Sequence, residues 1–217
     1  MNAEFWHERW KNGRTGFHQS EPNRYLAQYW DRLNVDTNAK VFVPLCGKSV
    51  DMVWLRDQGY EVIGTEWSPI AVRDFFEENG LKAEQSKQGE FERWEGAGVT
   101  LLCGDEFKLT ASDLDGVGAV YDRAALIAFP PEMRGAYVDH LHEIVPLGTK
   151  SLLVTIDYPQ HQHSGPPFSV PDDEVRALFK EGFEIEGIVS EDVLTDNGRF
   201  AGRVDYLNET AYLITSV

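Results

Sequence analysis

The stretch Val41–Pro69, VFVPLCGKSVDMVWLRDQGYEVIGTEWSP, predicts a strand, a tight turn, a helix and a second strand that ends in an acid. Its first residues form a short apolar run rich in β-branched side chains, as in a buried parallel strand. Gly47 breaks the run, and a glycine can take a positive φ and let a ligand approach the backbone closely. We expect a helix over 50–58 with Ser49 as its N-cap, then a strand over 60–65. This order is the layout of a βαβ unit that binds a nucleoside.

Glu66 follows the second strand, close to the usual spacing of about 20 residues after the glycine turn. An acid at that place accepts hydrogen bonds from ribose hydroxyls, and we prefer this role to the alternative that Glu66 only faces solvent. Leu45 and Cys46 flank Gly47, so the turn lacks the G-x-G-x-x-G that binds a pyrophosphate. A P-loop is unsupported, because Phe42 stands where its first glycine belongs. The turn therefore favours S-adenosylmethionine, which has a ribose and an adenine but no phosphate, over a nicotinamide cofactor.

The composition limits the class of protein. The 217 residues suffice for one α/β domain, and no apolar run is long enough to cross a bilayer. The formal net charge of −16 opposes binding to nucleic acid and to an anionic membrane surface. Residues 1–9 lack the apolar core of a secretory signal, so we expect Cys46 and Cys103 to be free thiols in a reducing, cytoplasmic compartment. We expect a monomer, because no exposed apolar helix stripe stands out.

Strands and helices alternate through the rest of the chain. We predict further strands over 99–103, 119–122, 151–156, 183–189 and 210–215, and helices over 73–79, 131–145 and 171–179. The alternation predicts a Rossmann-like α/β fold, whose mostly parallel sheet carries helices on both faces. The last two strands are expected to be antiparallel, since their connection is too short for a crossover helix. The polar segment 85–95 indicates a loop or an insert before the next strand.

Charged side chains follow two more of the predicted strands: Asp105 and Glu106 after one, Asp122 and Arg123 after the next. The carboxyl ends of parallel strands meet at one edge of a sheet, so these residues should join Glu66 there. Asp105 could accept a hydrogen bond from an adenine amino group, or it could be a turn residue that caps the next segment. Arg123 could contact a ligand, pair with Asp122 or remain a surface charge.

The N-terminal region combines aromatic side chains at helical spacing with a glycine-containing loop. The helix would carry Phe5, Trp6, Arg9 and Trp10, and the loop Gly13, Gly16, Phe17, His18 and Gln19. We favour a lid over the cofactor, with plain core packing as the alternative. Residues 1–35 would thus be the cover segment of a single domain, 1–217. His161 and His163 have no further ligands nearby, so we expect a solvated loop and no metal site.

These segments together resemble the thiopurine S-methyltransferase family, and its bacterial members in particular. The matching residues are Trp6, Trp10, Gly13, Phe17, His18 and Gln19, the segments 41–55 and 59–72, the stretch 122–126 and GPPFSVP at 165–171. The resemblance implies a seven-stranded, class I methyltransferase that depends on S-adenosylmethionine. The segment 197–203, near which the family places substrate contacts, matches poorly.

The resemblance also implies roles for single residues. The family's cofactor positions correspond to Trp10, Leu45, Glu66 and Arg123, and we add Gly47 from its turn and Asp105 and Glu106 by position alone. Arg123, as the catalytic residue, would favour the ionised form of an acceptor that Phe17 and His18 also contact. No general base is evident.

The reaction that the resemblance implies is methyl transfer to the sulfur of thiopurines and related aromatic or heterocyclic thiols. Bacterial members are associated with selenium and tellurium compounds, so metalloid detoxification or tellurite resistance is a further expectation. Two other classes stay open. An NAD-type oxidoreductase is opposed by the single-glycine turn, and a non-catalytic ligand-binding protein of the same fold would have no need of Glu66 or the Asp122–Arg123 pair.

Overall fold

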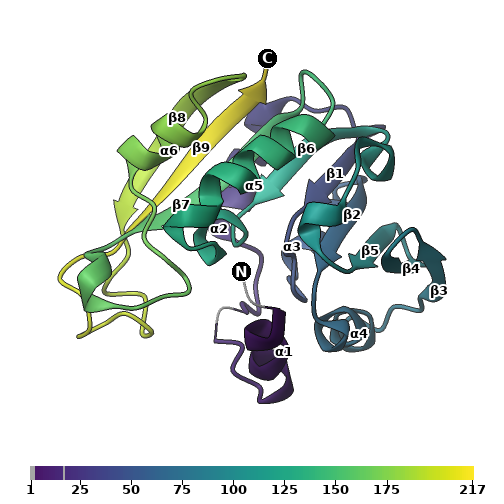
Figure 1. Ribbon diagram of the computed structural model, residues 1–217, viewed down its shortest axis with the longest axis horizontal. Helices are drawn as coiled ribbons and strands as arrows, with labels where there is room; N and C mark the ends of the chain where they lie inside the picture. The colour runs from purple at the N-terminus through teal and green to yellow at the C-terminus, as the bar shows by residue number, and fades with distance from the viewer. Residues whose placement is uncertain (1–2, 17) are drawn as a thin grey trace.

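A nine-stranded sheet forms the centre of the computed structural model, which describes residues 3–16 and 18–217 (Figure 1). The strands lie in the order β3-β4-β5-β2-β1-β6-β7-β9-β8. Their bounds are β1 Lys40–Val43, β2 Glu61–Glu66, β3 Glu84–Gln88, β4 Phe91–Gly96, β5 Val99–Cys103, β6 Val117–Asp122, β7 Lys150–Asp157, β8 Phe183–Asp192 and β9 Asn208–Ser216. Strands β5, β2, β1, β6 and β7 are parallel, and β9 is antiparallel to β7 and β8. The predicted Rossmann-like sheet and its antiparallel last pair are confirmed.

The hairpin of β3 and β4 extends the expected seven-stranded sheet to nine strands. Strand β4 pairs antiparallel with both β3 and β5, so the segment 85–95 is an insert before the next strand, the second of the two expected alternatives, and not a loop. Strand β3 lies at the sheet edge with its side chains largely exposed, and no apolar alternation marks it in the sequence. Phe91 anchors the hairpin, because its ring packs on Gly104, where an added Cβ would come within 2.6 Å of it.

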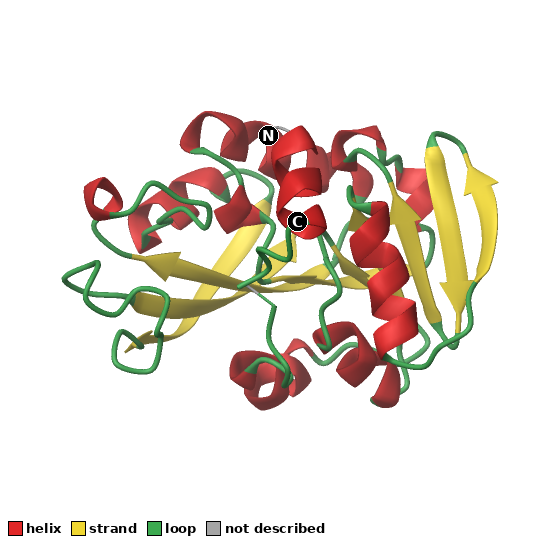
Figure 2. Ribbon diagram, turned by 90° about the horizontal axis from the view of Figure 1, so that it is seen from below, coloured by secondary structure: helices red, strands yellow, loops and turns green. Residues whose placement is uncertain are grey.

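Helices cover both faces of the sheet (Figure 2). The α-helices are α1 Ala3–Lys11, α2 Arg24–Tyr29, α3 Asp51–Asp57, α4 Pro69–Glu78, α5 Pro131–Ile144 and α6 Asp172–Leu178. Side chains of α2, α3 and α4 join one core cluster, and those of α5 and α6 join another. Strand β1 sends Val41 and Val43 into the first cluster and Phe42 into the second, as the two-residue period of a strand requires. Within the described residues, no helix is both long and apolar enough to cross a membrane.

Capping explains where two helices begin. Helix α4 begins at Pro69 rather than at residue 73, because Ser68 accepts a hydrogen bond from the Ala71 amide and proline suits the first turn. Helix α3 begins at Asp51, and its N-cap is Val50 rather than the predicted Ser49. The Ser49 hydroxyl still accepts a hydrogen bond from the Asp51 amide at 3.2 Å.

The N-terminal segment divides into two parts with different surroundings. Residues 24–33 form α2 and the 3₁₀ helix η1 (Trp30–Leu33), whose Tyr25, Leu26, Trp30 and Leu33 are at most 3% exposed in the core. Helix α1 lies outside the sheet and contacts α4 (Figure 1). Residues 24–33, which fall within the predicted cover segment 1–35, are therefore part of the core.

Candidate active site

A cavity of about 410 Å³ opens at the carboxyl ends of β1, β2 and β6. Strands β2 and β5 lie on one side of β1, and β6 and β7 lie on the other, so the chain order reverses between β1 and β6. Doubly wound sheets bind their ligands at such a switch point. We call Trp10, Leu45, Gly47 and Glu66 the turn side of the cavity, and Ile156, Pro166, Pro167, the loop 196–200 and Glu209 its loop side. Arg123 lies between the two sides.

The turn after β1 has an unusual backbone that places its amides beside Glu66. Leu45 and Gly47 have φ values of +44° and +55°, and the left-handed region is strained for a leucine. The Leu45 amide donates to the Thr65 hydroxyl at 3.2 Å, and the Cys46 amide donates to the Thr65 carbonyl at 2.8 Å. These bonds to β2 hold the strained turn. A Cβ on Gly47 would lie 3.1 Å from the ring of Trp10, so α1 packs directly on the glycine.

Glu66 is 6% exposed and is held by backbone amides on both sides. One carboxylate oxygen accepts from the Gly47 amide at 2.9 Å, and the other accepts from the Ser68 amide at 2.7 Å. Burial raises the pKa of Glu66 to about 7, although these hydrogen bonds favour the ionised form. Each oxygen keeps a further lone pair that can accept from a ribose hydroxyl.

The turn side fits S-adenosylmethionine better than a dinucleotide. Glu66 supplies acceptors for a ribose, and the indole of Trp10 supplies an apolar wall. Gly47 leaves no room for a side chain beneath that wall, and it is the only glycine of the turn, so there is no cradle for a pyrophosphate.

Arg123 is held in the cavity by Asp51 and not by its sequence neighbour Asp122. Its Nε lies 3.1 Å from an Asp51 oxygen, and the Asp51 side chain is 1% exposed. Burial alone would lower the pKa of Arg123. The electrostatic interactions with Tyr121 and Asp51 have a larger, opposite effect, so the pKa is raised above the ordinary value. Asp51 also accepts from the Asn23 amide at 2.7 Å and from the Tyr121 hydroxyl at 3.1 Å. One buried carboxylate therefore joins Arg123 to the start of α2.

Asp122 points to the opposite face of the sheet from Arg123. It accepts from the amides of Ala125 and Leu126 at 3.0 and 3.2 Å and from the Tyr137 hydroxyl at 2.7 Å. Burial raises its pKa to about 6. The expected Asp122–Arg123 pair is thus two side chains with separate roles, because successive residues of a strand face opposite sides.

Asp105 and Glu106 do not line the cavity. Asp105 is exposed and accepts from the Phe107 amide at 3.1 Å, which is the capping alternative that the sequence allowed. Glu106 is buried and accepts from the Thr65 hydroxyl, and burial raises its pKa to about 8. The same hydroxyl accepts a hydrogen bond from the Leu45 amide, so Thr65 links Glu106 to the turn.

The N-terminal residues close one wall of the cavity. Trp6, Trp10, Gly16, His18 and Gln19 line it, whereas Phe17 lies outside the described residues. Burial and the nearby Lys48 lower the pKa of His18, so its neutral form is favoured. An Nε2 hydrogen bond of 2.8 Å between His7 and the Trp67 carbonyl ties α1 to the end of β2.

The loop side contains residues that the sequence did not single out. Apolar groups of Ile156, Pro166, Pro167 and Phe200 form much of its wall. Its charged members are Asp196, Arg199 and Glu209, and Arg199 donates to the Pro166 carbonyl at 2.6 Å. The GPPF motif at 165–168 and the segment 197–203, near which the family places substrate contacts, pointed to this wall, whereas no motif marks Ile156 or Glu209.

Comparison with known proteins decides the family. A family model described as "Thiopurine S-methyltransferase (TPMT)" matches residues 1–217. Proteins named thiopurine S-methyltransferase from Pseudomonas aeruginosa and Nitrosospira multiformis are 50% and 49% identical over 215 residues. These alignments cover 99% of this chain, and 99% and 98% of the two relatives. The chain belongs to the thiopurine S-methyltransferase family. It is an enzyme, a methyltransferase that uses S-adenosylmethionine, as its turn side suggests.

Solved structures with low sequence identity share the fold. A methyltransferase from Anabaena variabilis matches with a TM-score of 0.68 at 15% identity, covering 100% of this chain and 96% of that one. A protein solved in work on thioacetal formation during echinomycin biosynthesis also has a TM-score of 0.68, at 17% identity, with 99% and 93% coverage. The class I methyltransferase fold is therefore shared well beyond the family.

Proposed function

We propose that this methyltransferase moves the methyl group of S-adenosylmethionine to the sulfur of small aromatic or heterocyclic thiols, thiopurines among them. The observation that carries the proposal is one continuous cavity, in which Arg123 lies between a turn side suited to the donor and an apolar loop side suited to a flat ring. The relatives named above bear the name of the same reaction. Selenium and tellurium acceptors belong to the proposal as well, because these atoms are soft nucleophiles like sulfur, and metalloid detoxification or tellurite resistance would follow from them.

The residues of the cavity would act mainly by position and charge. When bound, S-adenosylmethionine supplies an electrophilic methyl group on a cationic sulfur. Glu66 would bind its ribose, and Trp6 and Trp10 would exclude water from the reacting groups. Arg123 would stabilise the anionic form of the acceptor, since it stays charged and Asp51 fixes its direction. Holding the two reactants in line supplies much of the rate in a displacement of this kind.

Transfer of a labelled methyl group tests the proposal directly. Purified protein is incubated with methyl-labelled S-adenosylmethionine and, in separate reactions, with 6-mercaptopurine, benzenethiol, selenite or tellurite plus a reducing thiol. Label in the thiol products supports the proposed reaction. Label in the products of the selenite and tellurite reactions would extend the acceptors to selenium and tellurium compounds. Retention of all label in the donor with every thiol would overturn it. A fluorescence titration with NADH is the parallel test of the oxidoreductase alternative, for which we expect no binding.

A further inference from the structure

Glu209 places a carboxylate in the loop side of the cavity, near the start of β9. The residue pairs with Ile156 of β7 on one side and with Glu191 of β8 on the other. Ile156 and Glu209 both line the cavity, so the carboxylate belongs to the wall where an acceptor would lie.

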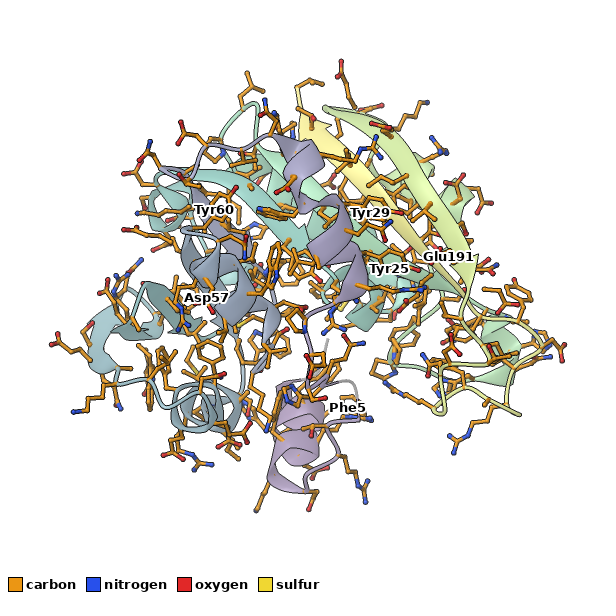
Figure 3. All side chains as sticks on the ribbon, turned by 180° about the vertical axis from the view of Figure 1, so that it is seen from behind. Phe5, Tyr25, Tyr29, Asp57, Tyr60 and Glu191 are labelled. Atoms are coloured by element: carbon orange, nitrogen blue, oxygen red, sulfur yellow. The ribbon has the colours of Figure 1, made fainter. Side chains whose placement is uncertain are left out.

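The surroundings of Glu209 differ from those of its cross-strand neighbour. Glu191 pairs with Arg24 at 2.7 Å and accepts a hydrogen bond from the hydroxyl of Tyr25 at 3.0 Å. Figure 3 labels Tyr25 and Glu191, which lie close to each other. Within residues 3–16 and 18–217, no group donates a hydrogen bond to the carboxylate of Glu209, and no cation lies within ion-pair distance of it. Two carboxylates directly opposite each other on adjacent strands are destabilising. A half-buried acid in this arrangement lowers the stability of the fold, and a functional role would account for it.

The groups around Glu209 set its basicity. Burial raises its pKa, the cations Arg24 and Arg123 oppose that rise, and Glu191 adds to it. The charged and titratable groups that face it are Arg24, Tyr25, Tyr121, Arg123 and Glu191. A carboxylate that is more basic than usual, and whose oxygens accept no hydrogen bond from the part of the chain that the structure describes, is suited to accept a proton from a ligand.

We propose that Glu209 is the general base of the methyl transfer and takes the proton of the acceptor thiol. This inference rests on the proposed function. The S–H bond breaks and its proton goes to a Glu209 oxygen, while the sulfur uses its electron pair to form the new S–CH₃ bond. The bond between the methyl carbon and the donor sulfur breaks, and its electron pair stays on that sulfur, which leaves S-adenosylhomocysteine. Glu209 then loses the proton to water after the methylated product departs.

The acidity of the acceptor decides how much this base contributes. A thiol with a pKa near 8.5 is only about 3% ionised at pH 7, so removal of its proton limits the reaction. An aromatic thiol that is already ionised at pH 7 has no proton to give. The base is therefore needed for weakly acidic thiols and idle for strongly acidic ones.

The test compares two acceptors of similar shape, benzylthiol and 4-nitrobenzenethiol, in the wild type and in Glu209→Gln. For benzylthiol at pH 7 we expect the variant to lose about tenfold or more in kcat/KM, since general bases contribute roughly 10²–10⁴-fold. For the ionised nitro compound we expect less than a twofold change. The variant's rate with benzylthiol should rise about tenfold per pH unit up to the thiol pKa, whereas the wild type should level off earlier.

The matched control is Glu184→Gln, which changes an exposed carboxylate of the same strand as Glu191, β8, outside the cavity and should leave both acceptors within twofold of the wild type. Calorimetry with S-adenosylmethionine checks that the Glu209→Gln pocket is intact. Equal losses with both acceptors, or no loss with either, would overturn the role of Glu209 while the proposed function stands. Failure of the wild type to methylate any thiol, 6-mercaptopurine and benzenethiol included, would overturn both.

Discussion

On the turn side of the cavity, two backbone amides donate hydrogen bonds to the carboxylate of Glu66. On the loop side, the carboxylate of Glu209 receives no hydrogen bond from the described residues. Apart from Trp10 of α1, the turn side comes from one contiguous stretch, in which Thr65 holds the strained turn and Gly47 packs against Trp10. The loop side gathers side chains from β7, β9 and two loops. The difference suggests a rigid site for one constant ligand beside a more adaptable site for several related ones. Changes on the turn side should therefore act on cofactor binding, and changes on the loop side on acceptor choice.

The largest expected effect is that of Glu66→Ala. The change leaves the amides of Gly47 and Ser68 without their buried acceptor and removes the ribose partner. We expect the Kd for S-adenosylmethionine to rise about 100-fold or more, roughly 2.7 kcal/mol, as measured by calorimetry. Acceptor KM at saturating cofactor should change far less. Unchanged cofactor affinity in a folded Glu66→Ala protein would rule out the ribose role.

Arg123→Ala should have the next largest effect, and it tests the junction of the two sides. We expect kcat/KM for thiol methylation to fall about 30-fold, because the variant loses the cation that favours an anionic acceptor. The fold should persist, as judged by circular dichroism, because Arg123 borders the cavity rather than the core. Turnover like that of the wild type would exclude Arg123 from the reaction.

Asp51→Asn distinguishes a positioning role from a purely structural one. Asn keeps the shape but loses the charge that fixes Arg123, so we expect about a tenfold loss in kcat/KM. If Asp51 acts through Arg123, the same change should cost less than twofold in an Arg123→Ala background, where there is no cation left to position. Fully additive losses would show that Asp51 serves only the fold, for example through its bond to the Asn23 amide.

Much of the turn side could be predicted from the sequence, and most of the loop side could not. Leu45, Gly47 and Glu66 sit at the spacing that one βαβ unit imposes, and a local pattern is enough to find them. Glu209 is one residue before the predicted strand 210–215, and only its pairing with Ile156 brings it to the cavity. Asp105 and Glu106 follow a correctly predicted strand but do not line the cavity, because the end of a strand does not say which side chain turns toward it.

A smaller effect is expected for Gly47→Ala, and Gly80→Ala is its matched control. Both glycines have a positive φ, +55° and +64°, so alanine strains both backbones. An added Cβ would lie 3.1 Å from Trp10 at position 47 and would meet nothing within 4 Å at position 80. We expect similar losses of thermal stability, but only Gly47→Ala should weaken cofactor binding, by about tenfold. Equal cofactor affinity in both variants would show that the contact between Trp10 and the turn is dispensable.

The smallest effect is the pH dependence of cofactor binding, which follows from the pKa of about 7 at Glu66. Ribose hydroxyls donate to the ionised carboxylate, so affinity should rise as the pH rises through 7 and fall several-fold between pH 7 and 6. Stability changes in the opposite sense. The folded state holds the Glu66 proton more tightly than the unfolded chain does, so this residue stabilises the fold below its unfolded pKa and loses that contribution as the pH rises toward 7. Calorimetry from pH 5.5 to 8.5 on the wild type and Glu66→Gln measures the binding effect, and the variant should show a flat profile. A wild-type affinity that stays constant over that range would mean that the carboxylate is ionised well below pH 7, and that the amides of the turn outweigh its burial.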